Sequence, residues 1–161
     1  MWTATETEDL TKAELYPQLL AQLRALIADE PDAVANMANC AALLFQQVTR
    51  LNWAGFYLLK DEQLVLGPFQ GAPACVRIPL GRGVCGTAAR DRAVLRVPNV
   101  HEFDGHIACD SASNSEIALP LLRGDGSLAG VLDLDSPEFD RFDAADEAGL
   151  VPIASAIAAK L

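Results

Sequence analysis

The sequence predicts an α+β domain, in which a central antiparallel sheet carries the N- and C-terminal helices on one face. Two observations lead to this class. Apolar residues recur at helical spacing only near the two ends of the chain, and the segments between them read as short strands joined by turns. Strands in sequence, flanked by terminal helices, form a sheet with those helices on one face.

Two helices are expected before the sheet and one after it. The first spans 11–29 and begins with a capping box at Thr11. The second spans about 32–50 and continues the helical spacing of apolar residues. The last spans about 143–160, with Asp143 as its N-cap.

The middle of the chain is expected to form six short strands. They span 52–60, 63–69, 74–78, 93–97, 116–122 and 127–135. A short helix at 84–90 follows the third strand. The loop 98–114 has little periodicity, and loops beyond about 12–15 residues in compact domains are usually functional or disordered. We expect this loop to cross the face opposite the terminal helices and to roof a pocket.

The length and charge of the chain limit the classes of function that it can have. The 161 residues suit one domain over 1–161, with helices in 1–50, the sheet and its loops in 51–142 and a last helix in 143–161. A net charge of −10 argues against binding a phosphate backbone, because that affinity rests on Lys and Arg. No apolar run approaches the roughly 20 residues that span a bilayer, and the acidic N-terminus is unlike a signal peptide. We expect a cytoplasmic protein that binds neither nucleic acid nor membrane.

Three of the four cysteines lie within residues 73–116, and a thiolate is a strong nucleophile. Cys109 lies in the long polar loop, where we expect it to be accessible. Cys75 lies in or at the end of the third strand. Cys85 follows a glycine break at a helix start, where a helix N-terminus favours the thiolate. Cys40, among alanines in the second helix, is expected to be a small buried core residue.

The cysteine spacing disfavours a zinc site. Cys75 and Cys85 are ten residues apart, Cys85 and Cys109 are twenty-four apart, and the sequence contains no Cys-x-x-Cys pair. A site built from Cys75, Cys109 and His106 is still geometrically possible. We expect no bound metal.

Three carboxylates are expected at one end of the second hairpin. Asp133 and Asp135 alternate on one strand and so share a face, and Glu116 opens the neighbouring strand. Because three such acids repel one another, at least one should keep its proton near neutral pH and could donate it to a substrate oxygen. The alternative interpretation of Asp133 and Asp135 is that they lie at a solvated strand end and have no role in the chemistry. Trp53 and Tyr57 share a face of the first strand, as a pocket wall or as ordinary core.

Seven motifs stand between about Asn52 and Phe142: NWAGFY (52–57), GPFQG (67–71), PACVRI (73–78), GRGVCGTA (81–88), GHIACDSAS (105–113), SEI (115–117) and GVLDLDSP (130–137). Through these motifs the chain resembles the GAF-domain free methionine-(R)-sulfoxide reductases. The resemblance is specific, because three cysteines lie in the contexts that are typical of that family.

This resemblance implies a GAF fold and the reduction of free L-methionine (R)-S-oxide to L-methionine, in a repair or antioxidant role. Cys109 matches the catalytic cysteine, Cys75 the resolving cysteine and Cys85 a third thiol that shares in recycling. The other matches are the acids around the sulfoxide oxygen and the pocket residues: Glu116, Asp133, Asp135, Trp53, Tyr57, Ile107 and Ala108.

The hypothesis that follows is a thiol mechanism without a bound cofactor. The Cys109 thiolate attacks the sulfoxide sulfur, methionine leaves and a sulfenic acid forms. Cys75 condenses with that acid to a disulfide, which thioredoxin reduces. The alternative is a non-catalytic GAF module that binds a small ligand or senses redox state. The expected fold also admits a homodimer through the N-terminal helices.

Overall fold

The computed structural model describes residues 10–105 and 111–161, and its elements follow the expected order along the chain. They are α1 (Lys12–Ile27), α2 (Ala33–Gln47), β1 (Trp53–Lys60), β2 (Gln63–Gly71), β3 (Arg77–Pro79), α3 (Gly83–Asp91), β4 (Leu95–Val97), the 3₁₀ helix η1 (Val100–Glu102), β5 (Ser115–Leu122), β6 (Leu128–Ser136) and α4 (Ala144–Ala158).

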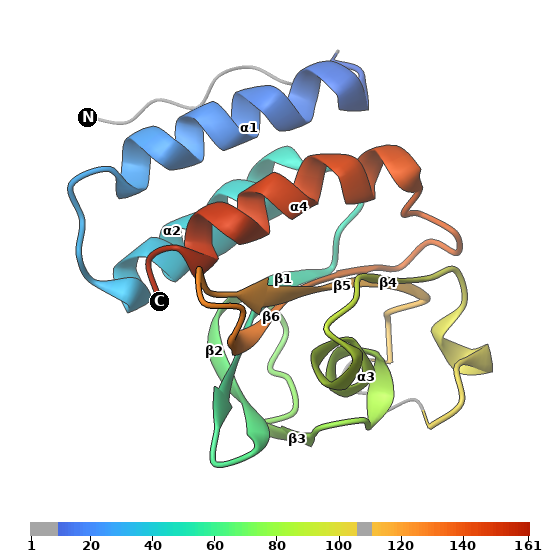
Figure 1. Cartoon of the computed structure of the whole chain (residues 1–161). Coiled ribbons are helices and arrows are strands. Elements are labelled where there is room, and N and C mark those ends of the chain that lie inside the picture. The colour runs from blue at the N-terminus through green and yellow to red at the C-terminus, as the bar shows by residue number, and fades with distance from the viewer. Residues whose placement is uncertain (1–9, 106–110) are drawn as a thin grey trace.

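The strands form one antiparallel sheet in the order β3-β2-β1-β6-β5-β4. Figure 1 shows α1, α2 and α4 stacked on one face of this sheet and α3 on the other. The predicted α+β class, with the terminal helices on one face, is therefore confirmed. The helix starts are also as predicted, because Thr11 and Asp143 both form capping boxes.

Alternation along the central strands divides the interior into two apolar cores. Phe56, Leu132 and Leu134 point to the helix side and pack with α1, α2 and α4. Residues of the opposite parity, such as Tyr57 and Val131, pack on the other side with α3. Because both faces of the central strands are covered, polar side chains on the α3 side are buried as well.

The third strand differs from its predicted position. It begins at Arg77, so Cys75 precedes the strand instead of lying in it. The reason is that carbonyls just before it bind aromatic side chains of β1: the Trp53 indole N–H donates to the Ala72 carbonyl, and the Tyr57 hydroxyl to the Cys75 carbonyl. Local β propensity cannot reveal such tertiary bonds.

Among the described residues no helix has both the length and the apolar character that crossing a membrane requires.

Candidate active site

The structure brings three predicted site residues together on the α3 side of the sheet: Cys85 of α3, Glu116 of β5 and Asp133 of β6. We call these three the thiol–acid cluster. The Cys85 sulfur and one oxygen of each carboxyl group lie within 4.8 Å of one another, and all three side chains are buried. The Cys85 thiol donates a hydrogen bond to Glu116 Oε1 at 3.5 Å. Asp135, which lies opposite Glu116 in the strand register, is the fourth polar side chain here.

Small residues lie beside Asp133 on both neighbouring strands. In the register Asp133 lies between Gly55 of β1 and Ala118 of β5. A Cβ at position 55 would collide with Phe69 and would come within 2.7 Å of the Trp53 ring. Gly55 therefore shapes the site. The sequence predictions gave it no role, although a glycine inside a strand often marks a close approach.

Burial dominates the electrostatics of the cluster. Burial first, then the Asp133 and Asp135 charges, raises the pKa of Glu116 well above its usual range. Burial also raises the pKa of Asp133, to about 6, although hydrogen bonds with Cys85 and Glu116 oppose the rise. Near neutral pH Glu116 therefore keeps its proton while Asp133 is largely ionised. The sequence predicted that at least one of the acids would stay neutral, and the structure identifies it as Glu116.

Cys85 lies in the first turn of α3, where a helix N-terminus favours the thiolate, but its other surroundings favour the neutral thiol. Burial, followed by the charges of Asp133, Glu116 and Asp135, raises the pKa of the Cys85 thiol well above its usual range. A helix N-terminus stabilises a negative charge by only about 0.3–1 kcal/mol at an exposed site. Desolvation and three nearby carboxyl groups outweigh that effect, so Cys85 stays a neutral thiol and a hydrogen-bond donor.

Three aromatic rings stack next to the cluster. Trp53 lies between Tyr57 and Phe69, with ring centroids 5.9 Å and 5.3 Å away, respectively. Trp53 and Tyr57 share a face, as the sequence predicts, and both are buried. Their polar atoms bind the carbonyls of Ala72 and Cys75, so the rings also fix the chain around Cys75. Phe69 was missed as the third ring, because only the β1–β2 pairing places it beside Trp53.

Cys75 is half-buried and takes part in a disulfide bond. By contrast, Cys40 and Cys85 carry free thiols. Cys40 is completely buried in α2, as the sequence predicts for a small core residue.

Four residues named in the sequence predictions lie in the segment 106–110, outside the described residues: His106, Ile107, Ala108 and Cys109. The chain on both sides of this segment is fixed. The Gly83 N–H, at the start of α3, donates to the Gly105 carbonyl at 3.1 Å. The Asn52 side chain, next to β1, donates to the Ser113 hydroxyl at 2.9 Å. Both attachments are close in sequence to the cluster and to the aromatic rings.

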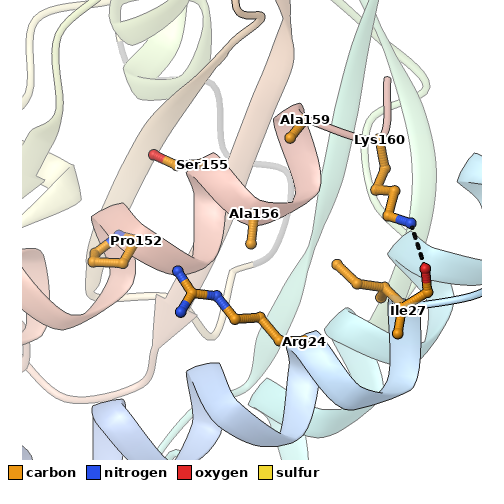
Figure 2. A pocket seen from close by; sticks show the side chains of 8 residues that line it. Arg24, Ile27, Pro152, Ser155, Ala156, Ala159 and Lys160 are labelled. Carbon is orange, nitrogen blue, oxygen red and sulfur yellow. Dashed lines mark hydrogen bonds between the residues drawn. The ribbon is translucent and has the colours of Figure 1, made fainter.

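A separate cavity of about 560 Å³ lies between α1 and α4, on the helix side of the sheet (Figure 2). It is lined by Arg24, Ile27, Ala28, Pro152, Ser155, Ala156, Ala159 and Lys160. None of these side chains carries a thiol or a carboxyl group, and the Lys160 ammonium already donates to the Ala28 carbonyl. This cavity therefore contains none of the thiols or acids that the sequence analysis singled out.

Comparison with known proteins identifies the family of the chain. The GAF domain family matches residues 34–161. A free methionine-R-sulfoxide reductase of Escherichia coli strain K12 is 57% identical over 141 residues, which cover 88% of this chain and 85% of the relative. The chain belongs to the GAF-domain family of free methionine-R-sulfoxide reductases.

Two further members of this family are similar to the chain, one in sequence and one in both sequence and structure. A free methionine-R-sulfoxide reductase of Saccharomyces cerevisiae is 39% identical over 158 residues, covering 94% of this chain and 88% of the yeast protein. The X-ray structure of free methionine-R-sulfoxide reductase from Neisseria meningitidis, in complex with its substrate, superimposes with a TM-score of 0.92 at 43% identity. That match covers 98% of this chain and 94% of the Neisseria protein.

Proposed function

We propose that the protein reduces free L-methionine (R)-S-oxide to L-methionine with its own thiols. The observation that carries this proposal is the buried, neutral Glu116 beside an ionised Asp133, in a chain of this reductase family. A sulfoxide oxygen gains negative charge when its sulfur is attacked. A neutral acid placed at that oxygen stabilises the charge and can supply the proton.

In the proposal, aromatic side chains of the protein bind the apolar end of the substrate. The stack of Trp53, Tyr57 and Phe69 offers aromatic surface next to the thiol–acid cluster. Sulfur and S-methyl groups pack favourably against aromatic rings. In the proposal this stack binds the methyl and thioether end of methionine, and Ile107 and Ala108 complete the pocket.

Cys109 is the proposed nucleophile. Its thiolate bonds to the sulfoxide sulfur while the sulfoxide oxygen takes up one proton. That hydroxyl then transfers to the Cys109 sulfur as both bonds to the substrate sulfur break, which releases methionine and leaves Cys109 as a sulfenic acid. The Cys75 thiol then displaces water from that sulfenic acid and forms a disulfide. Thioredoxin, the proposed reductant, supplies two electrons by dithiol–disulfide exchange and restores both thiols.

Two features of the described residues support the pairing of Cys75 with Cys109. Cys75 is disulfide-bonded while Cys40 and Cys85 are free. The attachments of Gly105 and Ser113 hold both ends of the nucleophile's segment close to α3 and β1. Cys85 keeps its proton, so we assign it no part in the first attack. A share of Cys85 in recycling stays a prediction.

The reaction is tested by substrate choice. With a thiol reductant present, the protein should reduce free methionine-(R)-sulfoxide and leave the (S) epimer and a peptide-bound sulfoxide essentially untouched. Failure to reduce the free (R) epimer would favour the alternative function, in which the GAF module binds a small ligand or senses redox state without turnover.

The thiol roles are tested by single-turnover experiments without a recycling reductant. Cys109→Ser should release no methionine. Cys75→Ser should still release about one methionine per chain but should recycle poorly with thioredoxin, because the sulfenic acid lacks its partner. Cys40→Ala is the matched control and should behave like the wild type. Methionine release by Cys109→Ser would remove Cys109 as the nucleophile, and normal recycling by Cys75→Ser would move the resolving role to Cys85.

Other sequence-based expectations stay predictions. They are the single domain over 1–161, the homodimer through the N-terminal helices, the cytoplasmic location and the absence of a bound cofactor or metal.

A further inference from the structure

We propose that the thiol–acid cluster is also a binding site for one divalent cation of the zinc type, and that this cation reversibly blocks the reductase. The site is distinct from the zinc site considered in the sequence, because its ligands are Cys85, Glu116 and Asp133. The blocking rests on the proposed function, whereas the binding does not.

The donor atoms already have nearly the spacing that zinc requires. Zinc binds sulfur at about 2.3 Å and carboxylate oxygen at about 2.0–2.2 Å, so tetrahedral ligands lie roughly 3.3–3.8 Å from one another. The Cys85 sulfur and Glu116 Oε1 are 3.5 Å apart. One oxygen of Asp133 lies within 4.8 Å of both donors, so a small side-chain adjustment would complete three ligands.

An unsatisfied oxygen points independently to a ligand. Asp133 is only 5% exposed, and its Oδ1 atom is buried without a hydrogen-bond partner among the described residues. A buried carboxylate oxygen without a partner is costly, and a cation at the cluster would satisfy it. The cation would also offset the repulsion among Glu116, Asp133 and Asp135.

The donor set selects the kind of cation. One sulfur and two carboxylate oxygens suit zinc, which takes mixed sulfur, nitrogen and oxygen ligands in tetrahedral sites. Calcium requires six to eight oxygens, and magnesium requires octahedral oxygen geometry. Zinc is also redox-inert, so its binding leaves the thiols unoxidised.

Cation binding and catalysis exclude each other. A metal-bound Cys85 is a thiolate, so the thiol proton leaves to solvent on binding. A metal-bound Glu116 is a carboxylate and can no longer donate to a sulfoxide oxygen. The cation therefore inhibits the working enzyme.

Binding is tested on the oxidised protein after chelator treatment, because Cys75 is then held in its disulfide. Cobalt(II) is the spectroscopic probe and zinc the competitor. We expect one equivalent of cobalt with a sulfur-to-cobalt charge-transfer band, which one equivalent of zinc abolishes. Cys85→Ser should remove the band. Cys40→Ser, at a buried thiol in the core on the other side of the sheet, should keep it.

The carboxylate ligands provide a second test that does not depend on the folding of the cysteine variant. Asp133→Asn and Glu116→Gln should each weaken zinc affinity by about tenfold or more. A band that survives Cys85→Ser, zinc affinity unchanged in both acid variants, or no cobalt binding by the folded wild type would each overturn the site.

Inhibition is measured separately on reduced protein, with a phosphine reductant. Zinc should suppress sulfoxide reduction and a chelator should restore it. Cobalt binding with no zinc inhibition would overturn the blocking role. A metal-free protein that reduces no sulfoxide would count against the proposed function instead, and the cobalt titration would still decide the binding site.

Discussion

At the scale of single residues, the protonation state of Glu116 decides what the thiol–acid cluster can do. Below its raised pKa the carboxyl group is neutral and can donate a hydrogen bond to a substrate oxygen. Above that pKa it becomes a second anion beside Asp133 and repels the charge that forms on the oxygen. Donation is therefore available at neutral pH and is lost as pH rises.

Glu116→Gln tests this role through the pH dependence of single-turnover methionine release. The wild-type rate should fall at alkaline pH as Glu116 loses its proton. Glutamine keeps an N–H donor but supplies no proton, so the variant should be about 10²-fold slower and should lack the alkaline fall. Glu138→Gln, at an exposed acid paired with Arg50, is the matched control and should keep the wild-type profile. An alkaline fall that persists in Glu116→Gln would assign the proton to another group.

The sequence was enough to predict that the acids lie close together, but not to predict the protonation state of each group. Asp133 and Asp135 alternate on a strand, and Glu116 opens the strand paired with it, so their proximity follows from local pattern. The protonation state of Cys85 depends on how deeply it is buried and on which strands its helix faces. Those are tertiary properties, which the position of Cys85 at a helix start does not reveal.

At the scale of elements, a buried carboxylate joins the first and last helices. Asp146 of α4 is fully buried, and its carboxylate accepts from the Tyr16 hydroxyl of α1 at 2.6 Å and from the Arg141 guanidinium at 3.2 Å. Lys12 of α1 adds an ion pair at 2.6 Å. This network fixes α1 against α4, the two helices furthest apart in sequence (Figure 1).

Tyr16→Phe should destabilise the fold by about 1–3 kcal/mol, because it leaves an oxygen of buried Asp146 with one donor fewer. Equilibrium unfolding in denaturant measures this loss. Arg90→Ala removes an exposed ion pair with Asp91 and should leave the free energy of unfolding essentially unchanged. The sulfoxide-reducing rate per folded Tyr16→Phe molecule should equal that of the wild type. Equal stability of Tyr16→Phe and the wild type would show that the network does not hold the helices.

The elements themselves were largely predictable from the sequence. Helical spacing, capping residues and turn residues are local, so the order of helices and strands was predicted correctly. The start of β3 was not, because the carbonyls of Ala72 and Cys75 bind side chains of a distant strand. Phe69 was missed for the same reason, because only the pairing of β1 with β2 makes it a neighbour of Trp53.

At the scale of the whole molecule, the site carries a cost in stability. Asp133 has a pKa of about 6 in the fold against 3.8 for the free side chain. At about 1.4 kcal/mol per pKa unit, an ionised Asp133 destabilises the fold by about 3 kcal/mol. Because the folded pKa is raised, this penalty is absent well below pH 3.8, grows as pH rises and is complete above about pH 6.

Asp133→Asn should therefore stabilise the protein while it slows the reaction. We expect a gain on the order of 1–3 kcal/mol in the free energy of unfolding at about pH 7, with little gain at about pH 4. Denaturant unfolding at the two pH values measures this gain. Asp91→Asn, at an exposed acid, should show no such gain. A destabilised Asp133→Asn at neutral pH, or a gain equal at both pH values, would contradict the buried-charge explanation.

The alternation along β6 also bears on how this protein can diverge over generations. A slip of one residue in its pairing would turn the carboxylates into the helix-side core and Leu132 and Leu134 toward α3 and Cys85. Insertions and deletions within the strand should therefore be purged in lineages that keep the activity. Exchanges of one apolar side chain for another at Leu132 or Leu134 meet only a packing requirement. The strand is thus rigid in length and permissive in composition, and the two kinds of change can be selected separately.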